Sequence, residues 1–275
     1  MASPKRIHGL LLLSGALLVL THVLGCKPSS DPGRFAEVLK VRVVEAYPHD
    51  ANAFTQGLEV EGETLYESTG IEGKSSLRKV DLKSGKVEHL QPLPDEYFGE
   101  GITTLDDRIF MLTWKGETCL VFEKKSFKHL QSFRYQGEGW GLTNDGTHLF
   151  MSDGSSAIRV LDPTTFEEVR KLRVKDRRAS IGNLNELEYF NEHIYANVWK
   201  EDRIAKIDPQ SGVVVAWVDC SNVYPRRLRS NPSEQVLNGI AYDADSGRTY
   251  ITGKNWPQLF EIEIIGESES TGKDQ

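Results

Sequence analysis

Residue types that could form a chemical site recur at matching places along the chain. Glu100 lies between two glycines in the sequence FGEG, directly before an apolar strand pattern. Glycine contributes no side-chain packing and costs backbone entropy, so inside a strand it usually marks a close approach or an unusual dihedral angle. We therefore expect the two glycines to leave room for a bound molecule beside the Glu100 carboxyl group.

Two equivalent positions of a repeated segment hold side chains of different chemistry. The residues that precede a repeated glycine, or its counterpart, are Gln56, Glu100, Trp140, Glu186 and Asn238. The residues at the end of the following strand are Gly70, Trp114, Gly154, Trp199 and Lys254. A structural repeat would place similar residues here. Two acids, two amides, three tryptophans and one lysine instead indicate a site on a repeated scaffold. Each residue alone also has a structural explanation, as core, a loop cap or a solvated rim charge.

Cysteine and histidine form no catalytic or metal-binding pattern. The seven histidines are scattered singly, without paired Cys/His spacing, so the sequence predicts no metal site and no cofactor. Cys119 and Cys220 lie in well-separated segments without a local histidine, and we expect two buried free thiols.

The net charge of −7 argues against a nucleic-acid partner.

The elements that position these residues are repeated strands. The segments are FTQGLEVEGETLYESTG from Phe54, FGEGITTLDDRIFMLTW from Phe98, EGWGLTNDGTHLFMSDG from Glu138, LNELEYFNEHIYANVW from Leu184 and VLNGIAYDADSGRTYITGK from Val236. Each holds two strands joined by a polar turn, and a third strand such as SSLRKVDL or RIAKIDP follows. Period-two alternation at intervals of about 40 to 52 residues predicts an all-β, five-bladed β-propeller over residues 38–265.

The last segment lacks a fourth strand, and an extra strand pattern precedes the first segment. The sequence VRVVEAYPHD, residues 41–50, is the expected N-terminal strand that completes the last blade and removes an open sheet edge. The polar residues 266–275 are expected to form a disordered tail.

The N-terminus has the pattern of an exported lipoprotein. Lys5 and Arg6 precede the apolar sequence GLLLLSGALLVLTHVLG, so residues 1–25 are interpreted as a signal peptide. The sequence VLGC is similar to the bacterial lipobox, in which Cys26 would be lipidated, although that pattern prefers Leu where Val23 stands. Residues 26–37 would then be a polar tether. An ordinary signal peptide with a chance cysteine is the alternative. The lipoprotein interpretation predicts a bacterial cell-envelope location, periplasmic or anchored to the outer membrane.

Eight short motifs, in order and at blade spacing, resemble those of one family. The motifs are FTQGL, FGEGIT, LTW, GWGL, LNELE, YANVW, LNGIA and TGKNW. Together they resemble the glutamine cyclotransferase family of plant type over about residues 42–264. The resemblance implies a five-bladed propeller and glutaminyl-peptide cyclotransferase activity. It also implies that the substrate-binding residues are Phe54, Gln56, Phe98, Trp114, Trp140, Asn185, Trp199 and Lys254.

The implied reaction needs no nucleophilic residue. The α-amine of an N-terminal glutamine attacks its own side-chain amide, pyroglutamate forms and ammonia leaves. By the resemblance, Glu100 is the general base and acid, and burial among aromatic rings would raise its pKa. Lys254, Gln56 and Asn185 are candidates to bind the carboxamide oxygen and the peptide backbone, and the tryptophans would exclude water.

Two other functions fit a propeller of this kind. A non-catalytic propeller lipoprotein could use the same aromatic pocket to bind a peptide end, or act as a scaffold for envelope partners. A lactonase would need a calcium cage of acidic and amide side chains, and the candidate positions are too rich in tryptophan for one. The Gln56, Glu100 and Lys254 combination favours the cyclotransferase.

Overall fold

Alternating apolar and polar residues form strands along almost the whole part of the chain that can be described. The computed structural model describes residues 36–266, and within this range it has twenty-two β-strands and a single short 3₁₀ helix, η1, Arg226–Leu228. The all-β class expected from the sequence is confirmed. The signal peptide, Cys26 and the tail from residue 267 lie outside the described residues.

Three segments each form a four-stranded antiparallel sheet. The first contains β2 (Thr55–Glu61), β3 (Thr64–Thr69), β4 (Ser76–Asp81) and β5 (Val87–Pro92). The second contains β6 (Gly99–Leu105), β7 (Arg108–Thr113), β8 (Thr118–Glu123) and β9 (His129–Arg134). The third contains β10 (Leu142–Asn144), β11 (Leu149–Ser152), β12 (Ala157–Leu161) and β13 (Glu168–Arg173). The expected strand order within each segment is confirmed.

The last two segments share one eight-stranded sheet, where two separate sheets were expected. One part consists of β16 (Leu184–Phe190), β17 (His193–Val198), β18 (Arg203–Ile207) and β19 (Val214–Asp219). The other part consists of β20 (Leu237–Asp243), β21 (Arg248–Gly253), β22 (Gln258–Ile265) and β1 (Glu37–Pro48). The parts are joined because β1 pairs in parallel with β19 as well as antiparallel with β22.

The N-terminal strand is present but begins earlier than expected. The sequence pattern predicts residues 41–50, whereas β1 spans Glu37–Pro48. Residues Glu37 to Lys40 pair with Ala216 to Asp219 of β19 and so extend the strand at its N-terminal end. A second difference is a short hairpin of β14 (Lys175–Asp176) and β15 (Ala179–Ser180), which the sequence analysis did not predict.

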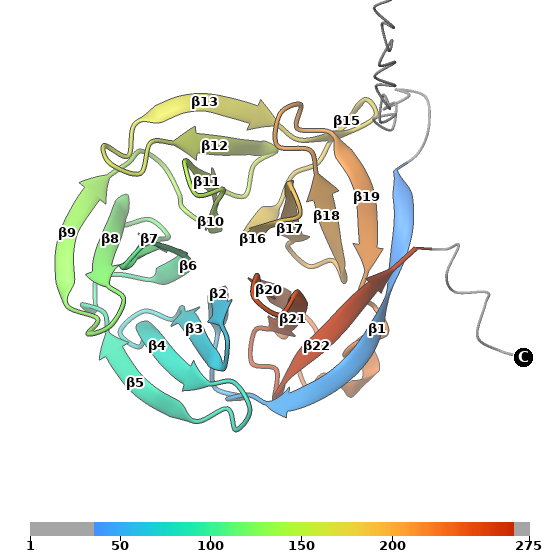
Figure 1. The fold of residues 1–275 in the computed structure, drawn as a ribbon, viewed down its shortest axis with the longest axis horizontal. Coiled ribbons are helices and arrows are strands. Elements are labelled where there is room, and N and C mark those ends of the chain that lie inside the picture. Colours follow the sequence, from blue (N-terminus) through green and yellow to red (C-terminus); the bar gives the residue numbers. More distant parts are fainter. Residues whose placement is uncertain (1–35, 267–275) are drawn as a thin grey trace, which may run out of the picture. The chain divides into compact units, whose positions relative to one another are not determined.

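The first strand of every segment lies near a common centre. Figure 1 shows β2, β6, β10, β16 and β20 innermost, with β5, β9 and β13 along the outside. These inner strands contact one another in a closed cycle, β2–β6–β10–β16–β20 and back to β2. Five apolar clusters fill the spaces between neighbouring strand groups, as between Phe110 and Leu149. The inner strands therefore present their starts to a shared region.

The expectation of two buried free thiols is confirmed. Cys119 and Cys220 are buried and unpaired, and burial raises the pKa of both thiols. Since the thiolate is the reactive form, we expect neither thiol to react with Ellman's reagent in the folded Cys26→Ser protein. Both should react after denaturation in guanidinium chloride. Rapid labelling of the folded protein, measured by absorbance, would contradict this placement.

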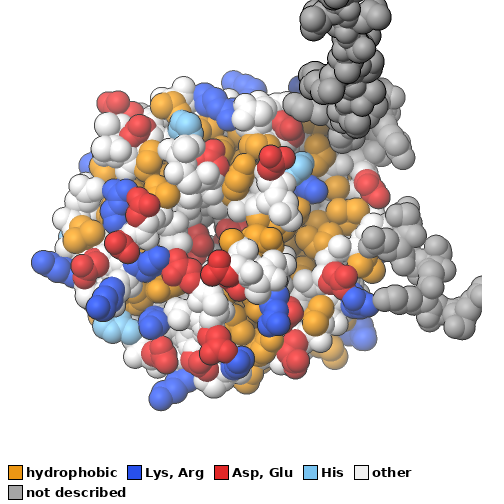
Figure 2. Space-filling model, viewed as in Figure 1, with side chains coloured by type: hydrophobic (Ala, Val, Ile, Leu, Met, Phe, Trp, Pro, Cys, Tyr) orange, Lys and Arg blue, Asp and Glu red, His pale blue; other side chains and the backbone are white. Residues whose placement is uncertain are grey.

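Charged side chains of both signs are interspersed on the outer surface. Figure 2 shows Lys, Arg, Asp and Glu side chains mixed around one face, without a large basic region on the face in view. Within residues 36–266, no helix has the length and apolar character needed to cross a membrane.

Candidate active site

Backbone hydrogen bonds place one predicted set of residues at equivalent positions. The amides of Gly70, Trp114, Trp199 and Lys254 donate to the carbonyl groups of Phe54, Phe98, Asn183 and Val236, respectively. Each bond joins the end of a segment's second strand to the residues that precede or begin its first strand. The side chains of Trp114, Trp199 and Lys254 therefore leave their sheets at the same end.

The fourth segment is aligned one residue away from the predicted register. Leu187 pairs with Ala196, as Ile102 pairs with Met111, so Glu186 occupies the place of the repeated glycine. The residue equivalent to Glu100 is therefore Asn185. Two equivalent hydrogen bonds from serine side chains confirm this alignment. Ser68 Oγ donates to the Glu100 carbonyl at 2.6 Å. The equivalent Ser152 Oγ donates to the Asn185 carbonyl, also at 2.6 Å.

The predicted aromatic residues form one continuous wall. Phe54 and Phe98 meet edge to face with centroids 6.3 Å apart, and Phe98 meets Trp114 at 5.6 Å. Trp140 and Trp199 form a second edge-to-face pair at 5.8 Å, in which Trp199 is 37% exposed. Such pairs add stabilisation beyond the area they bury, and they fix the ring orientations.

Glu138, which is not among the residues expected in the site, joins the two halves of this wall. Its Oε2 atom accepts hydrogen bonds from Trp114 Nε1 at 2.7 Å and from Trp140 Nε1 at 3.0 Å. The position two residues before Trp140 was the only signal in the sequence. A glutamate that bridges two indoles from different sheets cannot be recognised until their register is known.

Replacing Glu138 by Ala should loosen the wall, because both indole N–H groups lose a charged acceptor. We expect a loss of about 1–3 kcal/mol of stability. We also expect a weaker near-ultraviolet circular dichroism signal, since fewer tryptophans would hold a fixed orientation. Glu167→Ala, an exposed change in the β12–β13 turn, is the control. An unchanged spectrum and melting temperature in Glu138→Ala would show that the bridge does not order the wall.

Glu100 and Lys254 form an opposed pair of charges in a buried setting. Both residues are 5% exposed. Burial raises the pKa of Glu100 well above its usual range; the Lys254 ammonium opposes this shift and Glu138 adds to it. Burial lowers the pKa of Lys254 to about 8, against the attraction of Glu100. Lys254 Nζ also lies 4.7 Å from the centroid of the Phe54 ring. Burial thus shifts the pKa of each group toward that of the other, a pattern that is common at functional sites.

The Glu100 carboxylate and the Lys254 ammonium retain their hydrogen-bonding capacity. Within residues 36–266, neither group forms a side-chain hydrogen bond. A molecule that enters beside the wall can therefore contact an acid, a base and aromatic faces at once.

Several buried amides lie beside the pair, and some of their atoms are unsatisfied by the described residues. Gln56 is 3% exposed, and its Oε1 accepts a hydrogen bond from Asn238 Nδ2 at 3.3 Å. The Oδ1 atoms of Asn185 and Asn238 are buried without a partner among the described residues, as is Glu186 Oε1. Burying a polar atom without a hydrogen-bond partner costs free energy. Several such atoms close together are typical of a site that binds another molecule.

The glycines around Glu100 have a different purpose from the one expected. A Cβ atom on Gly101 would lie 2.7 Å from the Trp140 carbonyl oxygen and 2.6 Å from the Leu142 nitrogen. A Cβ atom on Gly99 would meet the Met111 side chain at 2.6 Å. Protein atoms fill the space beside both glycines, so they permit inner strands to pack backbone against backbone instead of making room for a bound molecule.

Glycine replaces tryptophan in two segments because neighbouring rings take the space. A Cβ atom on Gly70 would lie 2.3 Å from the Phe98 ring, and one on Gly154 would lie 2.7 Å from the Trp140 ring. The Gly/Trp alternation seen in the sequence therefore lets the wall continue from one segment to the next.

The structure gathers most of the predicted residues in one region. The contacts above connect Phe54, Phe98, Trp114, Trp140, Trp199, Lys254 and Glu100, and Gln56 packs beside Gly70. Asn185 is joined to the segment of Trp140 through Ser152, whose Oγ accepts from the Gly141 amide and donates to the Asn185 carbonyl. The basic loop before β20 lies close by, since Arg226 donates to the Lys200 carbonyl at 2.7 Å. Among residues 36–266, no three His, Cys, Asp or Glu side chains are placed to hold a metal ion.

Comparisons with known proteins agree on one family. The sequence model of the glutamine cyclotransferase family matches residues 16–264. An Arabidopsis thaliana protein named glutaminyl-peptide cyclotransferase is 40% identical over 269 residues, which cover 96% of this chain and 84% of that protein. The crystal structure of Myxococcus xanthus glutaminyl cyclase matches with a TM-score of 0.79 at 35% identity, over 84% of this chain and 99% of that one.

Proposed function

The chain belongs to the glutamine cyclotransferase family, and we propose that it converts N-terminal glutamine of peptides or proteins to pyroglutamate with release of ammonia. The observation that carries this assignment is the buried Glu100 carboxyl group, which faces the Lys254 ammonium beside an aromatic wall. A reaction within one residue needs a folded substrate and a proton carrier, and this arrangement supplies both.

Glu100 moves the proton in the proposed reaction. Its carboxylate accepts a proton from the α-amine as the nitrogen bonds to the side-chain amide carbon. The protonated carboxyl group then donates that proton to the departing nitrogen, the C–N bond breaks, and ammonia leaves. Burial raises the pKa of Glu100, which makes its carboxylate a stronger proton acceptor than an exposed glutamate, as a residue that takes up and returns a proton requires.

Lys254 and the buried amides stabilise the charge that develops on the substrate. The amide oxygen becomes negative as the ring closes, and Lys254 is the nearby cation that can offset this charge. Gln56 and Asn185 bind the carboxamide and the backbone of the substrate. The wall of Phe54, Phe98 and the tryptophans excludes water and holds the glutamine side chain folded against its own amine.

A five-bladed propeller is the architecture that best accounts for the strand groups. The closed cycle of inner strands and the equivalent register of the five segments support this arrangement. In this description the eight-stranded sheet represents two blades, and β1 supplies the outer strand of the last blade while it also binds β19.

We also propose that the chain is exported and anchored to the bacterial cell envelope by lipid on Cys26. The pattern of Lys5, Arg6, an apolar run and Val23–Cys26 supports this. Several acyl chains on one residue would give stable membrane binding, since each buried CH₂ adds about 0.8 kcal/mol. The wild-type chain should fractionate with membranes and incorporate labelled palmitate, and Cys26→Ser should do neither. A soluble, unlabelled wild-type chain would exclude the anchor.

Ammonia release from a short peptide that begins with glutamine tests the activity. We expect turnover that persists with a chelator present, together with the loss of one ammonia mass from the peptide. The same peptide beginning with asparagine is the control, because its shorter side chain cannot close the same ring. Well-folded protein without turnover, but with saturable binding of the glutamine peptide, would favour a peptide-binding propeller instead.

A further inference from the structure

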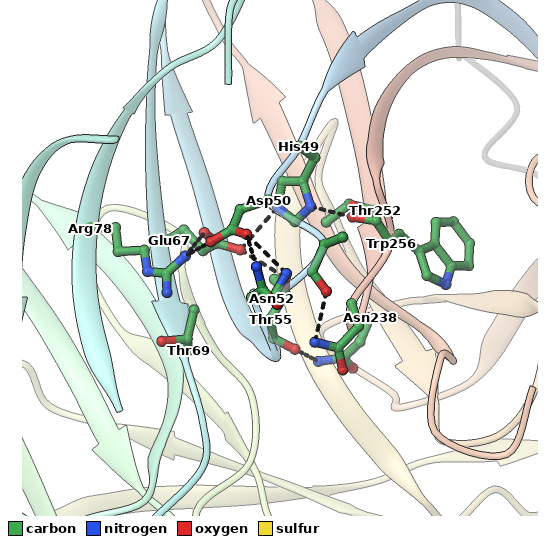
Figure 3. A network of polar contacts seen from close by, with 12 residues as sticks. His49, Asp50, Asn52, Thr55, Glu67, Thr69, Arg78, Asn238, Thr252 and Trp256 are labelled. Atoms are coloured by element: carbon green, nitrogen blue, oxygen red, sulfur yellow. Dashed lines mark hydrogen bonds and ion pairs between the residues drawn. The ribbon is translucent and has the colours of Figure 1, made fainter. Parts of the chain in front are cut away.

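A buried network of charged groups contacts the two segments that carry Phe54, Gln56 and Lys254. The side chains of His49 and Glu67 are 2% and 1% exposed, and their Nε2 and Oε1 atoms are 3.0 Å apart. Figure 3 shows His49 between Glu67 on one side and Trp256 on the other. Neither His49 nor Glu67 is used by the proposed reaction.

Both ring nitrogens of His49 face hydrogen-bond acceptors. Nδ1 lies 2.8 Å from the Trp256 carbonyl oxygen, and Nε2 lies against the Glu67 carboxylate. A neutral imidazole can donate from one nitrogen only, so this geometry calls for the doubly protonated ring. Burial lowers the pKa of His49, but the charge and hydrogen bond of Glu67, the Trp256 carbonyl and Asp50 together outweigh burial, and the pKa is raised. Burial in turn raises the pKa of Glu67, but His49, Arg78 and the Thr55 hydroxyl together outweigh burial, and this pKa is lowered.

The pair connects two segments that carry residues of the site. Glu67 Oε1 also accepts a hydrogen bond from Thr55 Oγ1 at 2.7 Å, and Thr55 stands between Phe54 and Gln56. On the other side, the bond from His49 reaches Trp256, two residues after Lys254. The Asn255 amide donates to the Ala53 carbonyl at 2.7 Å, which joins the same two segments directly.

The repeated fold does not require a carboxylate at the position of Glu67. The residues equivalent to Glu67, judged by their strand partners, are Met111, Met151, Ala196 and Ile251. Four of the five segments therefore fill this buried position with an apolar side chain. A buried charge is costly unless it is paired, so its presence in one segment needs a reason other than the scaffold.

We propose that His49 and Glu67 are a pair of positioning residues, which hold the Phe54–Gln56 and Lys254–Trp256 segments in register so that Lys254 stays over Phe54 and opposite Glu100. The inference rests on the proposed function for its effect on turnover. It also makes a prediction that does not depend on turnover. The pKa of Lys254 is low because its side chain is buried, and the His49–Glu67 pair keeps it buried.

The test uses His49→Phe, Glu67→Met and the double variant, in the full chain. The double variant puts an apolar residue at the Glu67 position, where the other four segments are apolar, and it removes both members of the ion pair together, so we expect it to fold. We expect kcat/KM to fall by about 10- to 100-fold in each variant, mostly through kcat, because a misplacement of about 1 Å costs that much. The double variant should lose no more than the worse single variant, since the two residues act as one unit. Ile158→Val, a core change in the third sheet, controls for a general loss of stability.

Two further measurements separate this inference from the proposed function. Histidine ¹⁵N resonances at pH 7 should show both His49 nitrogens protonated, and NMR titration should place the Lys254 pKa near 8 in the wild type but higher in the double variant. A neutral His49 ring, or a folded double variant with wild-type kinetics and an unchanged Lys254 pKa, would overturn the positioning role. An inactive wild type with the expected NMR results would remove the proposed function and leave the positioning of Lys254 standing.

Discussion

Glu100→Gln is expected to fold normally and to lose about 10²- to 10⁴-fold in kcat, the range that general acid–base catalysis contributes. The amide has nearly the same shape as the carboxyl group, but it cannot accept and return a proton. KM should change little, because glutamine retains the volume and hydrogen-bonding groups that contact the substrate. Ammonia release at pH 7–8, corrected for the folded fraction, measures the effect.

The matched control for this change is Glu188→Gln. Glu188 is also a buried carboxyl group whose pKa is raised well above its usual range, first by burial and then by Glu59 and Glu186. Burial therefore disfavours its charged form, and the neutral amide should substitute for it with little effect on turnover. Equal losses in Glu100→Gln and Glu188→Gln would indicate a general response to altered buried charge and would remove Glu100 from the mechanism.

Lys254→Met is expected to lose about 10²- to 10³-fold in kcat/KM while its melting temperature stays at or above that of the wild type. Removing one group that stabilises a developing oxyanion typically has an effect of this size. The stability change has the opposite sign because a buried ammonium is costly. The Lys254 pKa of about 8 lies below the ordinary value of 10.5, a difference equivalent to about 3 kcal/mol of unfavourable burial.

The pH dependence of stability follows from the same pKa difference. Between about pH 8 and 10.5 the unfolded chain binds more protons at Lys254 than the folded chain does. Wild-type stability relative to Lys254→Met should therefore be lowest below pH 8 and should recover as the pH rises through this window. Denaturation at pH 7 and pH 10 measures the difference.

The control for the activity of Lys254→Met is Lys206→Met, which removes a half-buried lysine over Tyr195 and should retain turnover. A variant that loses stability together with activity would indicate disrupted packing.

Repetition within the chain was sufficient to predict most of the strands and most of the wall. Short apolar runs, polar turns and matched tryptophans recur in the sequence, so Trp114, Trp199 and Lys254 could be assigned to one end of the sheets before any contact was known. The fourth segment was misaligned because Glu186 replaces the glycine that marks the register elsewhere. An irregularity in pairing between Leu184 and Leu187 hides the shift from the alternation pattern.

Residues that act through contacts between segments could not be predicted. Glu138 is an ordinary polar residue in a loop until Trp114 and Trp140 approach it from two sheets. His49 and Glu67 are 18 positions apart, and only the packing of β3 and the β21–β22 connection against the β1–β2 connection shows that they form one hydrogen-bonded network with Trp256. The start of β1 was missed for a similar reason, because its first residues pair with β19, far along the chain.

The double pairing of β1 has a consequence for when the protein becomes active. Arg42 and Glu263, which pair across β1 and β22, are 221 positions apart, so one of the earliest strands to be synthesised waits for the last. Phe54 and Lys254 come together beside this seam. A nascent chain that already contains Glu100 and all three tryptophans of the wall would still lack a complete site. Closing so long a loop is entropically costly, and the site is complete only after β22 has been synthesised and has paired with β1.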